Sequence, residues 1–146
     1  MFEHLKELEV KDKTAEFPLT ALRGCPKLIV RPATESNPSY FNEVLRRSSK
    51  MIRKVSQKKE ITVTTDDLAR NRNEDRNLFP KYVITDWKDV VDSKGNNVPF
   101  SEENCREFLK ALPDWIFDSI GIFCRDNSNF VPSSIDQEDL EEFAKD

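Results

Sequence analysis

The sequence predicts an α+β protein, with a small N-terminal antiparallel sheet or hairpin and a mainly helical C-terminal half. Two patterns predict this class. Apolar residues alternate with other residues in short runs before residue 32, as they do in strands. After residue 37 they recur every three or four positions, as they do in amphipathic helices. We expect one domain over residues 1–132, because 146 residues suffice for one core, and an acidic helix or tail over residues 133–146.

The predicted hairpin pairs residues 14–22 with residues 27–32. Pro18 lies within the first run and favours an edge of the sheet, because proline has no N–H to donate. The turn sequence RGCP separates this run from the β-branched run KLIVRP. A hairpin alone is not stable in water, so we expect a helix to cover it.

That helix is predicted over residues 38–55. Asn37 is a good N-cap, and proline suits the first helical position because its missing N–H would have no partner there. Apolar residues follow at helical spacing: Phe41, Val44, Leu45, Met51, Ile52 and Val55. The outer face is basic, with seven cations and no acid from residue 46 to residue 59: Arg46, Arg47, Lys50, Arg53, Lys54, Lys58 and Lys59.

The middle of the chain gives weaker signals. The run ITV after residue 60 is typical of a short strand, and Thr64 and Asp67 have the spacing of a capping box that opens a helix. Residues 69–77 are polar on every side, which fits a solvated helix or a connector. Apolar character returns between Leu78 and Trp87.

The stretch WKDVVDSKGNNVPFSEEN, residues 87–104, has three interpretations. A calcium loop requires acids at alternating positions and glycine at the sixth, but here the acids fall every third residue. A catalytic pair of Asp89 and Asp92 would require an apolar pocket, whereas the surrounding residues are polar. We therefore interpret the stretch as a structural clasp, in which Gly95 makes the turn while Trp87 and Phe100 pack on the following helices.

Two further helices are predicted after the clasp. Ser101 caps the first, which runs to about Leu112, and Pro113 ends it. The second presents a predicted core face of Trp115, Ile116, Ser119, Ile120 and Phe123. A last helix, capped at Ser134, carries six acids against one lysine.

The sequence lacks the residues that several kinds of catalytic, nucleotide-binding and metal-binding sites require. His4 is the single histidine and lies in a charged N-terminal segment where we expect fraying, so histidine-based catalysis is not predicted. Three glycines cannot form a glycine-rich phosphate loop, and three cysteines without a Cys-x-x-Cys pair predict neither a disulfide framework nor a zinc ribbon. We predict no catalytic, metal or cofactor site. Without a signal sequence or a long apolar run, we expect a soluble cytosolic protein.

The charged segments are candidates for partner binding or self-association. The candidate residues come from the basic helix and from the acidic tail: Arg46, Arg47, Lys50, Arg53, Lys54, Leu140 and Phe143. Clustered cations also suit nucleic acid, which remains an alternative. The net charge of −4 and the absence of aromatic residues among these cations argue against it.

Taken together, the chain resembles the tail assembly chaperones of long-tailed bacteriophages and prophages. The resemblance rests on LKELEVKDKTAEFPL, on LIVRPATESNPSYFNEVLRR, and above all on VITDWKDVVDSKGNNVPFSEEN followed by a leucine-containing helix, ALPDW and Phe130. It spans about residues 5–130, and the acidic tail lies outside it.

The resemblance implies a non-enzymatic protein that binds the tape-measure protein, keeps it soluble and helps to recruit tail-tube protein. Such a protein is expected in the cytoplasm of the bacterial host rather than in the mature virion, and related proteins are often made in two lengths by frameshifting. A homo-oligomer is possible, but the resemblance does not specify whether the protein self-associates. The alternatives are a nucleic-acid-binding module that acts through residues 46–59 and a structural or adaptor protein of the virion tail.

Overall fold

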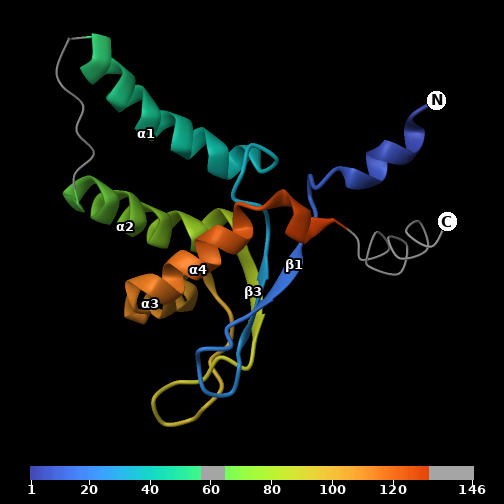
Figure 1. Ribbon diagram of the computed structural model, residues 1–146. Coiled ribbons are helices and arrows are strands. Elements are labelled where there is room, and N and C mark those ends of the chain that lie inside the picture. The colour runs from blue at the N-terminus through green and yellow to red at the C-terminus, as the bar shows by residue number, and fades with distance from the viewer. Residues whose placement is uncertain (57–64, 132–146) are drawn as a thin grey trace.

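Figure 1 shows the computed structural model, which describes residues 1–56 and 65–131. The predicted α+β class is confirmed, with a three-stranded antiparallel sheet and several helices. The elements follow one another as η1 (Glu3–Leu8), β1 (Ala15–Pro18), β2 (Lys27–Val30), α1 (Pro38–Ser56), α2 (Thr65–Tyr82), β3 (Ile84–Lys88), α3 (Glu102–Ala111), α4 (Asp114–Cys124) and η2 (Asn127–Phe130).

The sheet has the order β1-β2-β3 and includes a strand that the sequence analysis missed. β1 and β2 form the predicted hairpin, with Ala15 opposite Val30, and the proline-containing β1 lies at an edge. β3 pairs with the other side of β2, where Trp87 lies opposite Leu28. Its burial does not alternate along the strand, and the register shifts beside it, so the period-two signal of a strand is absent from its sequence.

The core lies where α2, α3 and α4 pack together and against the sheet. Leu28 and Val30 of β2, Phe79 of α2, Leu109 of α3 and Ile120 of α4 have no exposed surface. α1 follows a different course: it starts beside the sheet and then diverges from α2 (Figure 1). At its start, the buried side chain of Asn37 donates a hydrogen bond to the carbonyl of Tyr82 over 2.8 Å and so joins α1 to the end of α2.

Two sequence-based expectations are corrected. Residues 69–77 lie within α2, which agrees with the helix rather than the connector, but Asp75 and Arg76 among them are buried rather than solvated. Trp115, placed on the core face of its helix, has 66% of its surface exposed. The N-terminal segment, where we expect fraying, forms the 3₁₀ helix η1, in which no residue is buried.

Other predicted features lie outside the described residues. These are the short strand after residue 60, the Thr64 cap and the acidic C-terminal helix. Among the helices that the structure describes, none is both long and apolar enough to span a lipid bilayer.

Candidate functional site

Trp87 lies at the centre of the segment interpreted as a clasp. It is 7% exposed, and its indole N–H donates a hydrogen bond to the carbonyl of Val98 over 2.8 Å. The rings of Phe100 and Phe108 meet the indole edge-on, with centroids at 5.3 and 5.4 Å. The indole therefore joins β3, the chain that returns after the turn, and α3.

The turn within this segment uses Asp92 as a structural acceptor. One oxygen of its carboxylate accepts the backbone N–H groups of Lys94 and Asn96, both at 2.9 Å. The backbone hydrogen bond from Asn96 is the main cause that lowers the pKa of Asp92 below its usual value. Gly95 has a φ of 85°, a left-handed conformation that glycine adopts without strain. Within residues 1–56 and 65–131, no group of three or more His, Cys, Asp or Glu side chains is arranged to hold a metal ion.

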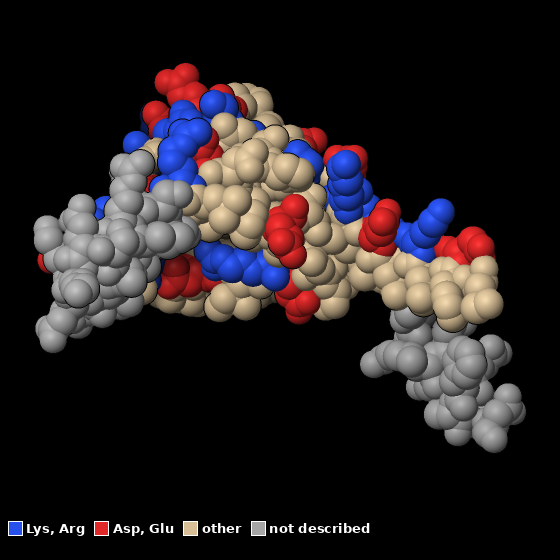
Figure 2. Space-filling model, turned by 90° about the horizontal axis from the view of Figure 1, so that it is seen from above, with Lys and Arg blue, Asp and Glu red and all other residues tan. Residues whose placement is uncertain are grey.

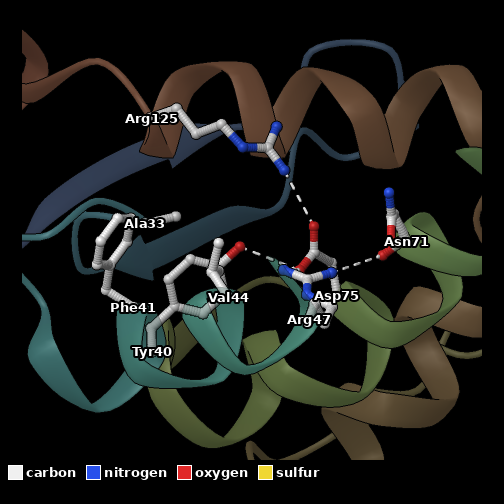
Figure 3. A pocket seen from close by; sticks show the side chains of 8 residues that line it. All are labelled: Ala33, Tyr40, Phe41, Val44, Arg47, Asn71, Asp75 and Arg125. Carbon is white, nitrogen blue, oxygen red and sulfur yellow. Dashed lines mark hydrogen bonds and ion pairs between the residues drawn. The ribbon is translucent and has the colours of Figure 1, made fainter. Parts of the chain in front are cut away.

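A groove lined by charged and apolar side chains lies between α1 and the C-terminal end of α4, with α2 beside it (Figure 3). We call it the interhelix groove. Its volume is about 380 Å³, and it is lined by Ala33, Tyr40, Phe41, Val44, Arg47, Asn71, Asp75 and Arg125. This site could not be predicted from the sequence, because its residues come from α1, α2, the C-cap of α4 and a loop, which are far apart in the chain.

Asp75 connects the three helices around this groove. Its carboxylate accepts hydrogen bonds from the Tyr40 hydroxyl at 3.0 Å, from Arg47 at 3.1 Å and from Arg125 at 3.0 Å. The Asp75 side chain is only 6% exposed, so these donors replace the water that the carboxylate loses on folding. Burial, assisted by the charge of Asp75, raises the pKa of Tyr40 to about 12, so this hydroxyl remains a donor.

Arg125 reaches Asp75 across Gly121. A Cβ atom at Gly121 would lie 2.6 Å from Nη1 of Arg125, so glycine leaves room for the guanidinium to fold back over α4. Arg47 also contacts Glu74 at 3.3 Å, so two acids and two arginines balance each other here. This balance is typical of a structural ion network rather than of a site for a free anion.

A second network fastens the start of α4 to α2. The buried guanidinium of Arg76 donates to the carbonyls of Leu109 and Leu112 at 3.0 and 2.8 Å and pairs with Asp114 at 2.9 Å. One turn earlier, Arg72 makes a two-pronged contact with Asp118, with both distances 2.9 Å. Such paired contacts fix the orientation of the two helices as well as their separation.

An exposed side of α4 carries large apolar residues. Trp115 is 66% exposed and Ile122 is 70% exposed. They are seven residues apart, about two helical turns, and therefore lie on the same side of the helix. We call this pair the outer α4 face.

The basic helix contributes two described cations, and both have acidic neighbours. Arg46 pairs with Glu43 at 3.2 Å, and Arg47 pairs with Glu74 and Asp75. Figure 2 shows the same mixture on one face of the molecule, where Lys and Arg lie next to Asp and Glu. Five other candidates lie outside the described side chains: Lys50, Arg53, Lys54, Leu140 and Phe143. The described part of this helix is therefore a poor phosphate-binding surface.

Two of the three cysteines lie in surroundings that do not activate a thiol. Cys105 and Cys124 are buried, and burial raises the pKa of each thiol to about 12. A thiol that stays protonated is a weak nucleophile and a poor metal ligand.

Comparison with known proteins relates this chain to a prophage protein family. Neither the curated proteins nor the solved structures contain a match to this chain. The family model described as "YdaY prophage protein" matches residues 35–141, which is most of the sequence. The matched range contains the clasp, the outer α4 face and every residue of the interhelix groove except Ala33. The match agrees with the phage or prophage origin that the sequence resemblance implies. The chain belongs to the YdaY prophage protein family.

Proposed function

We propose that this prophage protein is a non-enzymatic tail assembly chaperone. It binds the tape-measure protein in the cytoplasm of the bacterial host and assists assembly of the tail tube. The prophage family and the resemblance over about residues 5–130 support a role in phage morphogenesis. The structural observation that supports a binding function is the exposure of two large apolar side chains on the outer α4 face.

An exposed tryptophan and an exposed isoleucine on one side of a helix are suited to a helical client. An amphipathic client helix can place its apolar stripe against such a face. The contact removes the apolar stripe of the client and the exposed side chains of the face from water. The two side chains lose most of their exposed surface in that contact, and each Å² of apolar surface that is removed contributes roughly 25 cal/mol. The charged surface around the face keeps the chaperone itself soluble.

Arg72 and Arg76 of α2 hold α4 in place and so make the outer α4 face rigid. Arg72 and Arg76 hold Asp114 and Asp118 from the α2 side, so α4 does not have to be ordered when a client arrives. A preformed face loses less conformational entropy on binding than a mobile one. The outer α4 face therefore suits repeated binding along a long client.

The test is co-expression with the tape-measure protein encoded by the same prophage. We expect the intact chain to raise the soluble fraction of the tape-measure protein and to co-purify with it. The double variant Trp115→Ser, Ile122→Ser should fold normally and lose most of this effect. Val91→Ser is the matched control, because Val91 is also an exposed apolar residue, at 45%, but lies on the turn.

Two results would contradict the proposal. A tape-measure protein that stays insoluble beside the intact chain would exclude chaperone activity toward it. Detection of the protein in purified virions at fixed stoichiometry would instead indicate a structural or adaptor role.

A further inference from the structure

The first nine residues form an arm with an exposed apolar ridge. We call residues 1–9 the N-terminal arm; in Figure 1 it points away from the sheet, in a different direction from α1. In a 3₁₀ helix, side chains three positions apart lie above one another, so Phe2, Leu5 and Leu8 line up along one side of η1. They are 65, 50 and 46% exposed. We call these three residues the arm ridge.

The arm ridge is too small to hold a separate protein by itself. Short isolated helices are marginal in water, so we expect the ridge to be covered. Its three partly exposed side chains, each with at most about 250 Å² of surface, offer no more than about half of the roughly 800 Å² per partner that a stable complex buries. A segment of the same chain needs less surface, because it loses no translational freedom when it docks. The size of the ridge therefore favours a cover from the same chain.

The described part of the chain ends beside the base of the arm. Leu8 and Val10 line a hollow of about 460 Å³ together with residues from the start of α1 and with Asn127 of η2. η2 ends at the buried Phe130, and the described residues end at Val131. In Figure 1 the arm and η2 meet the body on the same side. The residues that follow η2 therefore start next to the arm.

Residues 132–146 have the length and the side chains to cover the arm ridge. This stretch, which we call the C-terminal segment, lies outside the described residues. From its first to its last residue the arm ridge extends about 12 Å, since a 3₁₀ helix rises about 2 Å per residue, whereas fifteen residues extend about 22 Å even as an α-helix. The segment carries three large apolar residues among six acids: Ile135, Leu140 and Phe143. Leu140 and Phe143 are three positions apart, which is also the spacing of neighbouring residues in the arm ridge.

We propose that the C-terminal segment folds back over the N-terminal arm of its own chain, so that Leu140 and Phe143 cover the arm ridge. The contact is apolar, and the acids of the segment remain in water. It withdraws the arm ridge from contact with other copies. The inference goes beyond the proposed function, because it involves neither the outer α4 face nor the tape-measure protein.

Paramagnetic broadening in NMR spectra tests this contact. A nitroxide spin label is attached at Lys145→Cys in a chain that also carries Cys25→Ser, because Cys25 is only partly buried whereas Cys105 and Cys124 are buried. The amide signals of the arm ridge should broaden. The broadening should persist at high salt, because arm and segment each carry more acids than basic side chains and salt screens their repulsion. A label at Lys94→Cys, on the turn of the clasp, is the control and should leave these signals sharp.

Two variants of the C-terminal segment show whether the contact is apolar. Leu140→Gln, Phe143→Gln should abolish the broadening of the arm-ridge signals. Glu141→Gln, Glu142→Gln is the matched control, because it changes two neighbouring residues but keeps both apolar side chains, and the broadening should remain. Both variants change only the segment, so the signals of the core residues show that the body of the protein is still folded.

Each other result overturns the proposal. Sharp arm-ridge signals in the intact labelled chain exclude the docking. Broadening that appears only between a labelled chain and a separate isotope-enriched chain shows that the segment covers the arm of a second copy. Broadening that survives Leu140→Gln, Phe143→Gln shows that these two residues do not make the contact. None of these measurements includes the tape-measure protein, so a failure here is distinct from a failure of the proposed function.

Discussion

α2 and α4 are joined by ion pairs, and each departs in part from the burial that its sequence predicts. α2 is polar on every side around residues 69–77, yet it buries Asp75 and Arg76. α4 is the more apolar helix, yet it leaves Trp115 and Ile122 largely exposed. Of the ion pairs between the two helices, the Arg76 side chain is buried, while part of the apolar surface of α4 faces solvent.

This difference between α2 and α4 shows that the burial of a side chain depends on the neighbours that it contacts in the folded protein. Asp75 is buried because Tyr40, Arg47 and Arg125 supply three donors to its carboxylate. Trp115 is exposed because the inner side of α4 is already occupied by Ile116, Phe117 and Ile120. A buried charge without donors would be costly, and an exposed tryptophan without a partner is a surface available for binding.

The two tryptophans provide the sharpest test of this contrast. Trp87→Ala should lower the free energy of unfolding by about 3–5 kcal/mol, because it removes a buried ring that packs on Phe100 and Phe108. Trp115→Ala should change it by less than about 1 kcal/mol. Urea unfolding of both variants measures the difference, and equal losses would show that Trp115 is not on the surface.

Replacement of Asp75 tests whether the buried charges of α2 stabilise the protein. Asp75→Ala leaves Tyr40, Arg47 and Arg125 without their shared acceptor, and we expect a loss of about 2–3 kcal/mol, since the partly exposed arginines regain some water. Glu102→Ala is the control: its pair with Arg106 lies four residues apart on an exposed helix surface and should contribute about 0.5 kcal/mol or less. Similar effects of both changes would mean that the Asp75 network does not stabilise the helices.

Alkaline pH should destabilise the packing around α4. Burial raises the pKa of Cys105, Cys124 and Tyr40 to about 12, so the folded protein retains protons that the unfolded chain releases. Their contribution to stability is complete below the unfolded pKa values and is lost as pH rises toward about 12. Between pH 8 and about pH 9.5, the two thiols should reduce the unfolding free energy by about 1–2 kcal/mol. A stability that stays constant over this range would indicate that the thiols are solvated.

The smallest expected effect is that of divalent cations. Asp92 already binds two backbone N–H groups, and the acids around it have the wrong spacing for calcium. Millimolar calcium or magnesium should leave the melting temperature unchanged. A saturable increase would contradict this prediction, because a ligand that binds the native state stabilises it.

Local signals in the sequence predicted a large part of the fold. Proline and the turn sequence located the hairpin, and the apolar periodicity after Asn37 located α1. Ser101 caps α3 as predicted: its hydroxyl accepts the backbone N–H of Asn104 at 3.0 Å. These features depend on residues within a few positions of each other, so they can be recognised without knowledge of the fold.

The sequence by itself determined the α+β class, the hairpin and the starts of α1 and α3, because local backbone preferences and apolar periodicity specify them. Only the tertiary structure decided that Asp75 lies at the meeting point of α1, α2 and α4. Its three donors lie at least 28 residues away in the chain, and no periodic pattern connects them. The tertiary structure likewise decided which apolar side of α4 remains exposed. Burial of a side chain depends on the neighbours that folding brings to it, and residues distant in the sequence supply those neighbours.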